Sequence, residues 1–143
     1  MGKVSDLMSR DVCAVQSEDS IATVAKVMAD KDMGFLPVVE GQKLVGAVTD
    51  RDIVVRALAK GASSDASIKD IMSPTVKSVS QDDEFAAAIK TMGDAQLRRL
   101  PVVDQDSNLV GVVALADAAR ERDPAVVGAA LGEVTQPGGS HAS

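Results

Sequence analysis

The segment Val4-Ser-Asp-Leu-Met-Ser9 returns 64 residues later as Ile68-Lys-Asp-Ile-Met-Ser73. Two further stretches repeat in the same order: Leu36-Pro-Val-Val39 as Leu100-Pro-Val-Val103, and Leu44-Val-Gly46, one residue further apart, as Leu109-Val-Gly111. The extra residue falls where a turn is expected, and surface loops tolerate insertions. A repeat sustained over such a length indicates that the chain consists of two copies of one structural unit.

Each copy contains one run of apolar residues at helical spacing. These residues stand at i, i+3, i+4 and i+7: Ile21, Val24, Ala25 and Met28 in the first copy, and Phe85, Ala88, Ile89 and Met92 in the second. The spacing predicts an amphipathic helix in each copy. We expect Ser20 to cap the first helix and Asp82 or Asp83 to cap the second.

Short runs rich in valine predict the strands. Joined by brief polar turns, such runs are typical of hairpins. The expected strands are Phe35–Val39, Leu44–Thr49, Leu100–Val103 and Leu109–Ala114, with short strands near Val12–Val15 and Val76–Val79. Second helices are expected over about Asp50–Leu58 and Leu115–Arg122. Each copy is therefore predicted to be a β-α-β-β-α unit, and the fold class α+β.

These elements divide the chain into a first unit (residues 1–60), a linker (61–67), a second unit (68–123) and a tail (124–143). We expect the tail to be partly disordered, with a last helical turn over Ala125–Leu131. A single unit with three strands cannot cover both faces of its own sheet. The two units are therefore expected to pack through their sheets with pseudo-two-fold symmetry, leaving clefts between them where ligands bind.

Composition disfavours several classes of function. The net charge of -6 argues against duplex nucleic acid or an anionic membrane as the main partner. Cys13 is the only cysteine and His141 the only histidine, so we expect no disulfide, no metal site and no catalytic residues of the Ser-His or Cys-His type. No stretch has the character of a signal peptide or approaches the ~20 apolar residues of a membrane-spanning helix. We expect a soluble, cytoplasmic protein.

The duplicated unit resembles the CBS-domain pair. The resemblance covers about residues 4–120 and rests on these motifs: Asp6-Leu-Met8, Asp70-Ile-Met-Ser-Pro74, the two Leu-Pro-Val-Val runs, Leu44-Val-Gly-Ala-Val-Thr-Asp-Arg-Asp-Ile53 and Leu109-Val-Gly-Val-Val-Ala-Leu-Ala-Asp117. It implies a regulatory sensor that binds AMP, ADP or ATP, with S-adenosylmethionine or NAD as variants, and that forms a homodimer. Members usually regulate an attached enzyme or transporter, whereas here we expect a stand-alone pair that acts on an unidentified regulated protein.

The family's ligand signature, Gly-h-h-Thr/Ser-x-x-Asp with h apolar, is matched by Gly46-Ala-Val-Thr49-Asp-Arg-Asp52. A carboxylate can accept hydrogen bonds from both ribose hydroxyls, and Thr49 with backbone N–H groups at a helix start can hold a phosphate. The residues alone fit equally well a capping box in front of an apolar helix. With the resemblance added, we favour ligand contact for Asp52.

The second copy has Gly111-Val-Val-Ala114-Leu-Ala-Asp117, which lacks the hydroxyl but keeps the carboxylate. A reciprocal capping box is impossible there, and phosphate binding is in doubt. We therefore expect two unequal sites, with the Thr49/Asp52 site the better one and Asp117 contributing to the other.

Arg98 and Arg99 stand where members of the family often carry basic residues that face the ligand phosphates. Adjacent residues of a strand point to opposite faces, so only one arginine can face inward. The other is expected to be solvated or salt-bridged. Val12, Phe35 and Pro37 are candidates for the wall that contacts adenine.

Glycines and methionines at matching positions are interpreted as structural. Gly46 and Gly111 indicate a close backbone approach or a bulge within a strand. The methionines that recur between the copies are expected to fill the core: Met8, Met28, Met72 and Met92.

Two functions of different classes fit the chain. The first is a ligand-sensing regulatory pair that signals by a change in the orientation of its units or of a dimer. The alternative is a ligand-free dimeric interaction or scaffold protein. An enzyme is disfavoured, because the charged residues form no acid-base constellation around a nucleophile.

Overall fold

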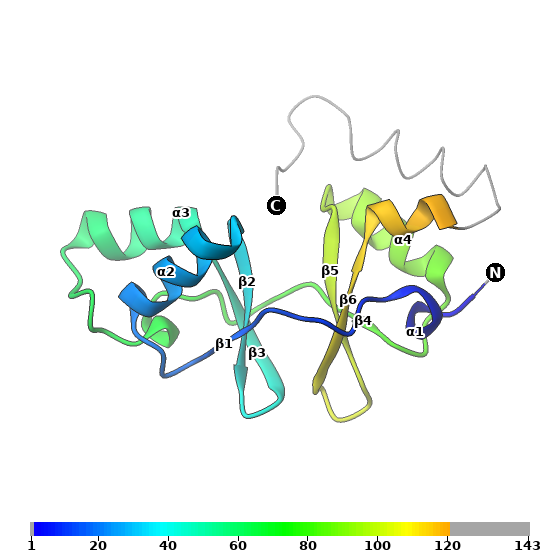
Figure 1. The fold of residues 1–143 in the computed structure, drawn as a ribbon, viewed down its shortest axis with the longest axis horizontal. Coiled ribbons are helices and arrows are strands. Elements are labelled where there is room, and N and C mark those ends of the chain that lie inside the picture. The colour runs from blue at the N-terminus through cyan, green and yellow to red at the C-terminus, as the bar shows by residue number, and fades with distance from the viewer. Residues whose placement is uncertain (1, 121–143) are drawn as a thin grey trace. The chain divides into compact units, whose positions relative to one another are not determined.

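The computed structural model describes residues 2–120, which contain two three-stranded sheets with their helices (Figure 1). The strands of the first sheet are β1 (Val15–Gln16), β2 (Phe35–Glu40) and β3 (Lys43–Thr49), and those of the second are β4 (Val79–Ser80), β5 (Arg99–Val103) and β6 (Leu109–Ala114). In each sheet the first strand is parallel to the second, and the second is antiparallel to the third. The predicted α+β class with two like units is confirmed.

The two amphipathic helices, α2 (Ile21–Lys31) and α4 (Phe85–Ala95), form where their spacing predicted them. Ser20 caps α2, since its side-chain oxygen accepts a hydrogen bond from the Thr23 amide at 3.1 Å. The predicted cap of α4 is wrong: the N-cap is Glu84, without a side-chain cap bond. Asp83 instead accepts from the Ser80 amide at 3.0 Å and so stabilises the turn between β4 and α4.

The helix that follows β3 is irregular. It begins as α3 (Asp50–Asp52) and continues as a π-helical turn over Ile53–Ala57 and a 3₁₀ turn over Leu58–Lys60. The corresponding segment of the second repeat, Leu115–Arg120, is 3₁₀-helical. Its predicted end at Arg122 and the predicted tail, with Ala125–Leu131 and His141, lie outside the described residues.

The two segments that open the repeats pack in a way that the sequence did not predict. The first contains the helical turn α1 (Val4–Leu7), and the second contains a 3₁₀ turn over Ile68–Asp70. Ser9 pairs with Val112 of β6 through hydrogen bonds of 2.8 and 2.9 Å. Ser73 pairs with Ala47 of β3 through hydrogen bonds of 2.9 and 3.0 Å. Each opening segment therefore lies against the last strand of the other repeat.

As a result, the compact units of the fold are not divided where the repeats are. Residues 13–76 form one unit, here called the first-repeat unit. Residues 2–12 join residues 77–120 in the other, the second-repeat unit. The predicted boundaries at residues 60, 67 and 123 delimit the sequence duplication, whereas contacts divide the chain after Val12 and after Val76.

Two glycines permit these opening segments to lie close to the strands. A Cβ on Gly46 would lie 2.5 Å from the Ser73 carbonyl oxygen, and one on Gly111 would lie 2.8 Å from that of Ser9 and 2.7 Å from Met8 Sδ. Only glycine lets two backbones come so near. The predicted close backbone approach is confirmed at both positions.

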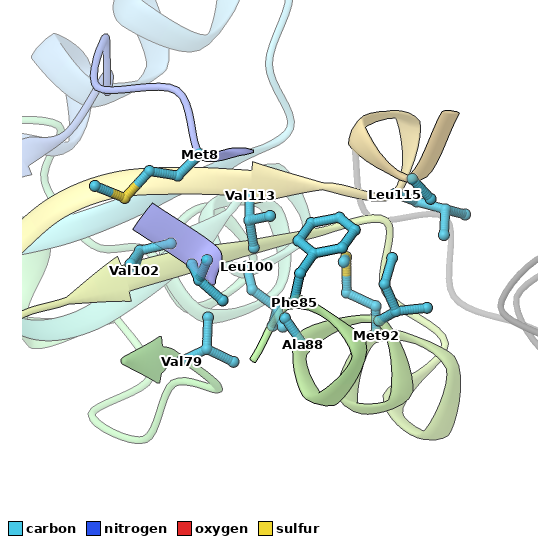
Figure 2. Close-up of a cluster of buried hydrophobic side chains, with 12 residues drawn as sticks. Met8, Val79, Phe85, Ala88, Met92, Leu100, Val102, Val113 and Leu115 are labelled. Carbon is cyan, nitrogen blue, oxygen red and sulfur yellow. The ribbon is translucent and has the colours of Figure 1, made fainter. Parts of the chain in front are cut away.

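Each unit has its own apolar core between its sheet and its helices. Figure 2 shows the core of the second-repeat unit, whose labelled residues are Met8, Val79, Phe85, Ala88, Met92, Leu100, Val102, Val113 and Leu115. The first-repeat unit has an equivalent core, built on Ile21, Val24, Met28, Leu36, Val38 and Val48. Met8, Met28 and Met92 are buried and Met72 is partly buried against the core, so the predicted structural role of the methionines is confirmed.

Candidate functional site

The strand β3 turns into helix α3 at Thr49, and this corner carries the signature residues. The Thr49 hydroxyl oxygen accepts a hydrogen bond from the Asp52 amide at 3.1 Å. The Asp52 carboxylate accepts in return from the Thr49 amide, with Oδ2 at 2.9 Å. The two residues therefore form the capping box that was one of the two interpretations of the sequence.

The second carboxylate oxygen of Asp52 faces a cation. Oδ1 lies 3.7 Å from Nε of Arg56, whose Nη1 donates to the Ile71 carbonyl oxygen at 3.5 Å. The side chain of Asp52 is 20% exposed and that of Arg56 is 51% exposed. An ion pair this open to solvent is weak, so a hydroxyl group can compete with Arg56 for Oδ1.

The first amides of α3 are already hydrogen-bonded. The Asp50 amide donates to the Gly34 carbonyl oxygen at 2.9 Å, and the Arg51 amide donates to the Asp50 carboxylate at 2.8 Å. The Asp52 amide is held by Thr49. These amides therefore have partners within the chain in this conformation, and their expected part in holding a phosphate stays a prediction.

Apolar side chains lie on the same face of the sheet as Thr49. Phe35 is the direct partner of Thr49 across β2 and β3, and Pro37 is the partner of Ala47. Neighbours along a strand point to opposite faces, and the alternating residues Leu36 and Val48 belong to the core. Phe35, Pro37 and Thr49 thus share the face away from the core.

These two candidates for the adenine wall differ in exposure: Phe35 is half-buried and Pro37 is buried. The third candidate, Val12, is half-buried and belongs to the second-repeat unit. Its part in the site stays a prediction, as does the cleft that the sequence predicted between the two repeats.

The equivalent corner of the second repeat lies between β6 and the helical turn after it. Asp117 Oδ2 accepts a hydrogen bond from the Ala114 amide at 2.9 Å, as Asp52 does from Thr49. Ala114 has no hydroxyl oxygen that could accept a hydrogen bond from the Asp117 amide. This corner therefore contains half of a capping box. That the Thr49/Asp52 site binds a ligand better stays a prediction.

The two arginines before Leu100 occupy different positions. Arg99 is the first residue of β5, pairs with Ala114 and shares the non-core face with Pro101. Arg98 precedes the strand, and its carbonyl oxygen accepts from the Leu115 amide at 2.7 Å. Both are exposed, and within residues 2–120 neither takes part in an ion pair. Both therefore adjoin the Ala114–Asp117 corner, and which of the two side chains faces a ligand stays a prediction.

Arg56 is the residue at this site that the sequence analysis missed. Its signal was the i, i+4 spacing from Asp52 on a predicted helix, a spacing that brings an acid and a base together. The corresponding position of the second repeat is Glu121, so the two signature segments also differ here in sequence.

No group of three or more His, Cys, Asp or Glu side chains in residues 2–120 is arranged to hold a metal ion. None of the helices in that range has the length and apolar character needed to span a bilayer.

The sequence motifs, the fold and the duplicated corner together define a class of protein. The family model described as "CBS domain" matches the chain twice, at residues 4–58 and 68–123. This chain therefore belongs to the CBS-domain family and contains two copies of the domain.

Individual relatives agree with this assignment. The CBS domain-containing protein YhcV of Bacillus subtilis (strain 168) is 39% identical over 119 residues, which cover 83% of this chain and 84% of YhcV. The crystal structure of Hypoxic Response Protein I with two coordinated zinc ions is similar with a TM-score of 0.73 and 31% identity, covering 84% of this chain and 98% of that one.

Two similar structures contain adenosine compounds. The structure of CBSX2 in complex with AMP has a TM-score of 0.71 and 25% identity, and covers 84% of this chain and 95% of that one. The CBS-domain pair of protein MJ0100, in complex with 5-methylthioadenosine and S-adenosyl-L-methionine, has a TM-score of 0.66 and 30% identity, and covers 84% and 94%.

Proposed function

We propose that this chain is a regulatory, ligand-sensing module, not an enzyme, and that it binds an adenosine nucleotide at the Thr49–Asp52 corner. The observation that carries the proposal is the arrangement of this corner: a carboxylate with one oxygen held only by a weak ion pair, next to a hydroxyl and an apolar face. The structures of similar CBS-domain proteins with AMP and with S-adenosylmethionine support an adenine-containing ligand.

Each side chain of the corner has a distinct role in this proposal. Asp52 Oδ1 accepts hydrogen bonds from the ribose hydroxyls and exchanges its contact with Arg56 for them. The Thr49 hydroxyl, whose oxygen accepts from the Asp52 amide, still has a proton to donate to a phosphate oxygen. Phe35 and Pro37, together with Val12, contact the adenine ring.

The Ala114–Asp117 corner is proposed as the weaker site. Asp117 offers a carboxylate for ribose, and Arg99, with Arg98 next to it, offers positive charge for a phosphate. A phosphate there lacks the hydroxyl that Thr49 supplies in the first repeat. AMP, ADP and ATP are the proposed ligands, with S-adenosylmethionine and NAD as variants.

Signalling follows from differential affinity. A ligand that binds one orientation of the units, or of the two chains of a homodimer, more tightly shifts the population toward that orientation. A regulated protein that contacts only this orientation then responds to the ligand concentration.

Isothermal titration calorimetry with AMP, ADP, ATP, S-adenosylmethionine and NAD tests the proposal. We expect at least one nucleotide to bind with a Kd below about 1 mM, which corresponds to about −4 kcal/mol. If none of the five compounds binds that tightly, the ligand-free scaffold function replaces the sensor.

Variants of the two aspartates separate ligand contact from helix capping. Asp52→Asn keeps an oxygen that can accept from the Thr49 amide but removes the charge. We expect it to weaken nucleotide binding at least tenfold and to leave the melting temperature of the free protein nearly unchanged. Asp117→Asn is the matched control and should have the smaller effect on affinity. A lower melting temperature of ligand-free Asp52→Ala, together with wild-type affinity of Asp52→Asn for the nucleotide, would assign Asp52 to capping alone.

A further inference from the structure

The first turn after β3 carries negative charge, so a phosphate group bound beside it needs a cation. Asp50 and Asp52 both place carboxylates on this turn. A phosphate group carries about −1.5 to −2 charges at neutral pH, and like charges repel each other strongly where water is partly excluded. A ligand whose ribose is held by Asp52 keeps its phosphate close to these carboxylates. The Thr49 hydroxyl can donate one hydrogen bond to the phosphate, but it adds no positive charge.

Two exposed arginines follow Thr49 on the same helix, and their spacing separates them. Residues three and four apart are neighbours on a helix surface, whereas adjacent residues point in different directions. The Asp52 amide donates to the Thr49 hydroxyl oxygen at 3.1 Å, and Asp52 Oδ1 lies 3.7 Å from Arg56 Nε. Arg56 therefore lies on the side of the helix that carries the corner. Arg51 adjoins Asp52 in sequence and does not share this side.

The chain holds the guanidinium group of Arg56 only loosely. Its Nη1 donates to the Ile71 carbonyl oxygen at 3.5 Å, and its Nε lies 3.7 Å from Asp52 Oδ1. Hydrogen bonds between N–H groups and oxygen are usually about 2.7–3.2 Å long, so both contacts are weak. The side chain is 51% exposed, and a guanidinium has several N–H donors. Arg56 can therefore turn toward a ligand at little cost.

We propose that Arg56 selects ligands that carry a phosphate. When the ribose hydroxyls bind Asp52 Oδ1, the guanidinium leaves this oxygen and donates to the phosphate, next to the Thr49 hydroxyl. The planar fork of arginine fits two oxygens of one phosphate group. The ligand class of this corner is thus an adenosine phosphate, in preference to adenosine, which is neutral, and to S-adenosylmethionine, whose sulfonium is positive. The inference rests on the proposed function and names the ligand class of the same site.

The second repeat has the opposite charge at the equivalent position of its sequence. Asp117 is followed four residues later by Glu121, where Asp52 is followed by Arg56. A carboxylate has no proton to donate to a phosphate and repels it. Substitution of Arg56 therefore changes a feature that the first repeat alone has.

Isothermal titration calorimetry of the full chain with AMP and with adenosine tests the role of Arg56. All samples carry Asp117→Asn, so that binding at the second corner contributes little. We expect the parent chain to bind AMP at least about tenfold more tightly than adenosine, because charge-assisted hydrogen bonds to phosphate are among the strong ones.

Arg56→Gln should weaken AMP at least about tenfold, since the charged donor to the phosphate is lost. It should not weaken adenosine, because Arg56 then no longer competes with the ribose for Asp52 Oδ1. S-adenosylmethionine should bind this variant at least as tightly as it binds the parent chain. A residue that only positioned Asp52 would instead change the affinities for all three compounds in the same direction.

Two further variants serve as controls. Arg51→Gln removes the same charge from the same helix and should leave the preference for AMP within about twofold. Arg56→Lys keeps the charge without the fork and should restore part of the preference. Thermal unfolding without ligand checks the fold, and Arg56→Gln should melt close to the parent chain because its exposed ion pair contributes little.

The outcomes separate this inference from the proposed function. Equal affinities of the parent chain for AMP and adenosine, or an equal loss of both in Arg56→Gln, would overturn the role of Arg56 and leave the nucleotide site in place. Loss of the preference in Arg51→Gln instead of Arg56→Gln would also overturn it. Binding of neither compound to the parent chain would overturn both proposals.

Discussion

Asp52 and Asp117 occupy equivalent positions in the two repeats, but only Asp52 has a hydroxyl group, that of Thr49, beside it. Both carboxylates hold the amide three residues earlier, at 2.9 Å in each case. Only in the first repeat is there a reciprocal bond, which the Asp52 amide donates to the Thr49 hydroxyl oxygen. The capping role is therefore common to both repeats, whereas the hydroxyl that we propose to donate to a phosphate is present only in the first.

The cap itself gives a prediction about stability. Thr49→Ala removes the oxygen that holds the Asp52 amide and should lower the free energy of unfolding by about 1 kcal/mol. Ala114→Thr supplies the missing oxygen in the second repeat and should raise it by a similar amount. Urea denaturation followed by circular dichroism measures both changes. If the two substitutions shift stability in the same direction, the hydroxyl is not the cap.

Sequence patterns predicted the helices and strands whose formation depends on local spacing of apolar residues. The periodicity of Ile21 to Met28 predicted α2, and the valine-rich runs predicted β2, β3, β5 and β6. The π-helical turn after Asp52 was not predicted, because an amphipathic pattern does not distinguish it from an α-helix. The cap of α4 was mispredicted because Asp83 has a competing partner, the Ser80 amide, in the preceding turn.

The contact between an opening segment and a strand depends on glycine. Gly46→Ala would place a Cβ 2.5 Å from a backbone oxygen of Ser73, which cannot move aside as a side chain can. We expect a loss of about 1–3 kcal/mol in the free energy of unfolding, the usual range for overpacking. Chemical denaturation measures the loss. Gly46→Ala with wild-type stability would show that Ser73 does not lie on β3.

At the scale of the whole molecule, the two repeats depend on one another because they exchange their opening segments. Val4 is fully buried in the second-repeat unit, and Ile68 is fully buried in the first-repeat unit. Sequence patterns could not predict this exchange, because the two opening segments are alike and each fits either β3 or β6. Only the pairings of Ser9 with Val112 and of Ser73 with Ala47 decide between the two arrangements.

The exchange predicts crossed effects of matched substitutions. Val4→Ala should reduce the hydrogen-exchange protection of α4, β5 and β6 more than that of α2, β2 and β3. Ile68→Ala, at the equivalent position, should do the reverse and cost about 2–5 kcal/mol of local stability. Exchange measured by mass spectrometry on both variants gives the comparison. If each substitution weakens its own repeat instead, the opening segments are not exchanged.

We propose above that an adenosine nucleotide binds at the corner formed by Thr49 and Asp52. The most direct test is a titration of the isotope-labelled chain with AMP, followed through its backbone amide resonances. We expect the resonances of residues 34–36 and 49–56 to shift first, and those of residues 99, 100 and 114–117 to follow at higher AMP concentration. Shifts that begin at residues 114–117, or spectra unchanged by millimolar AMP, would contradict this binding site.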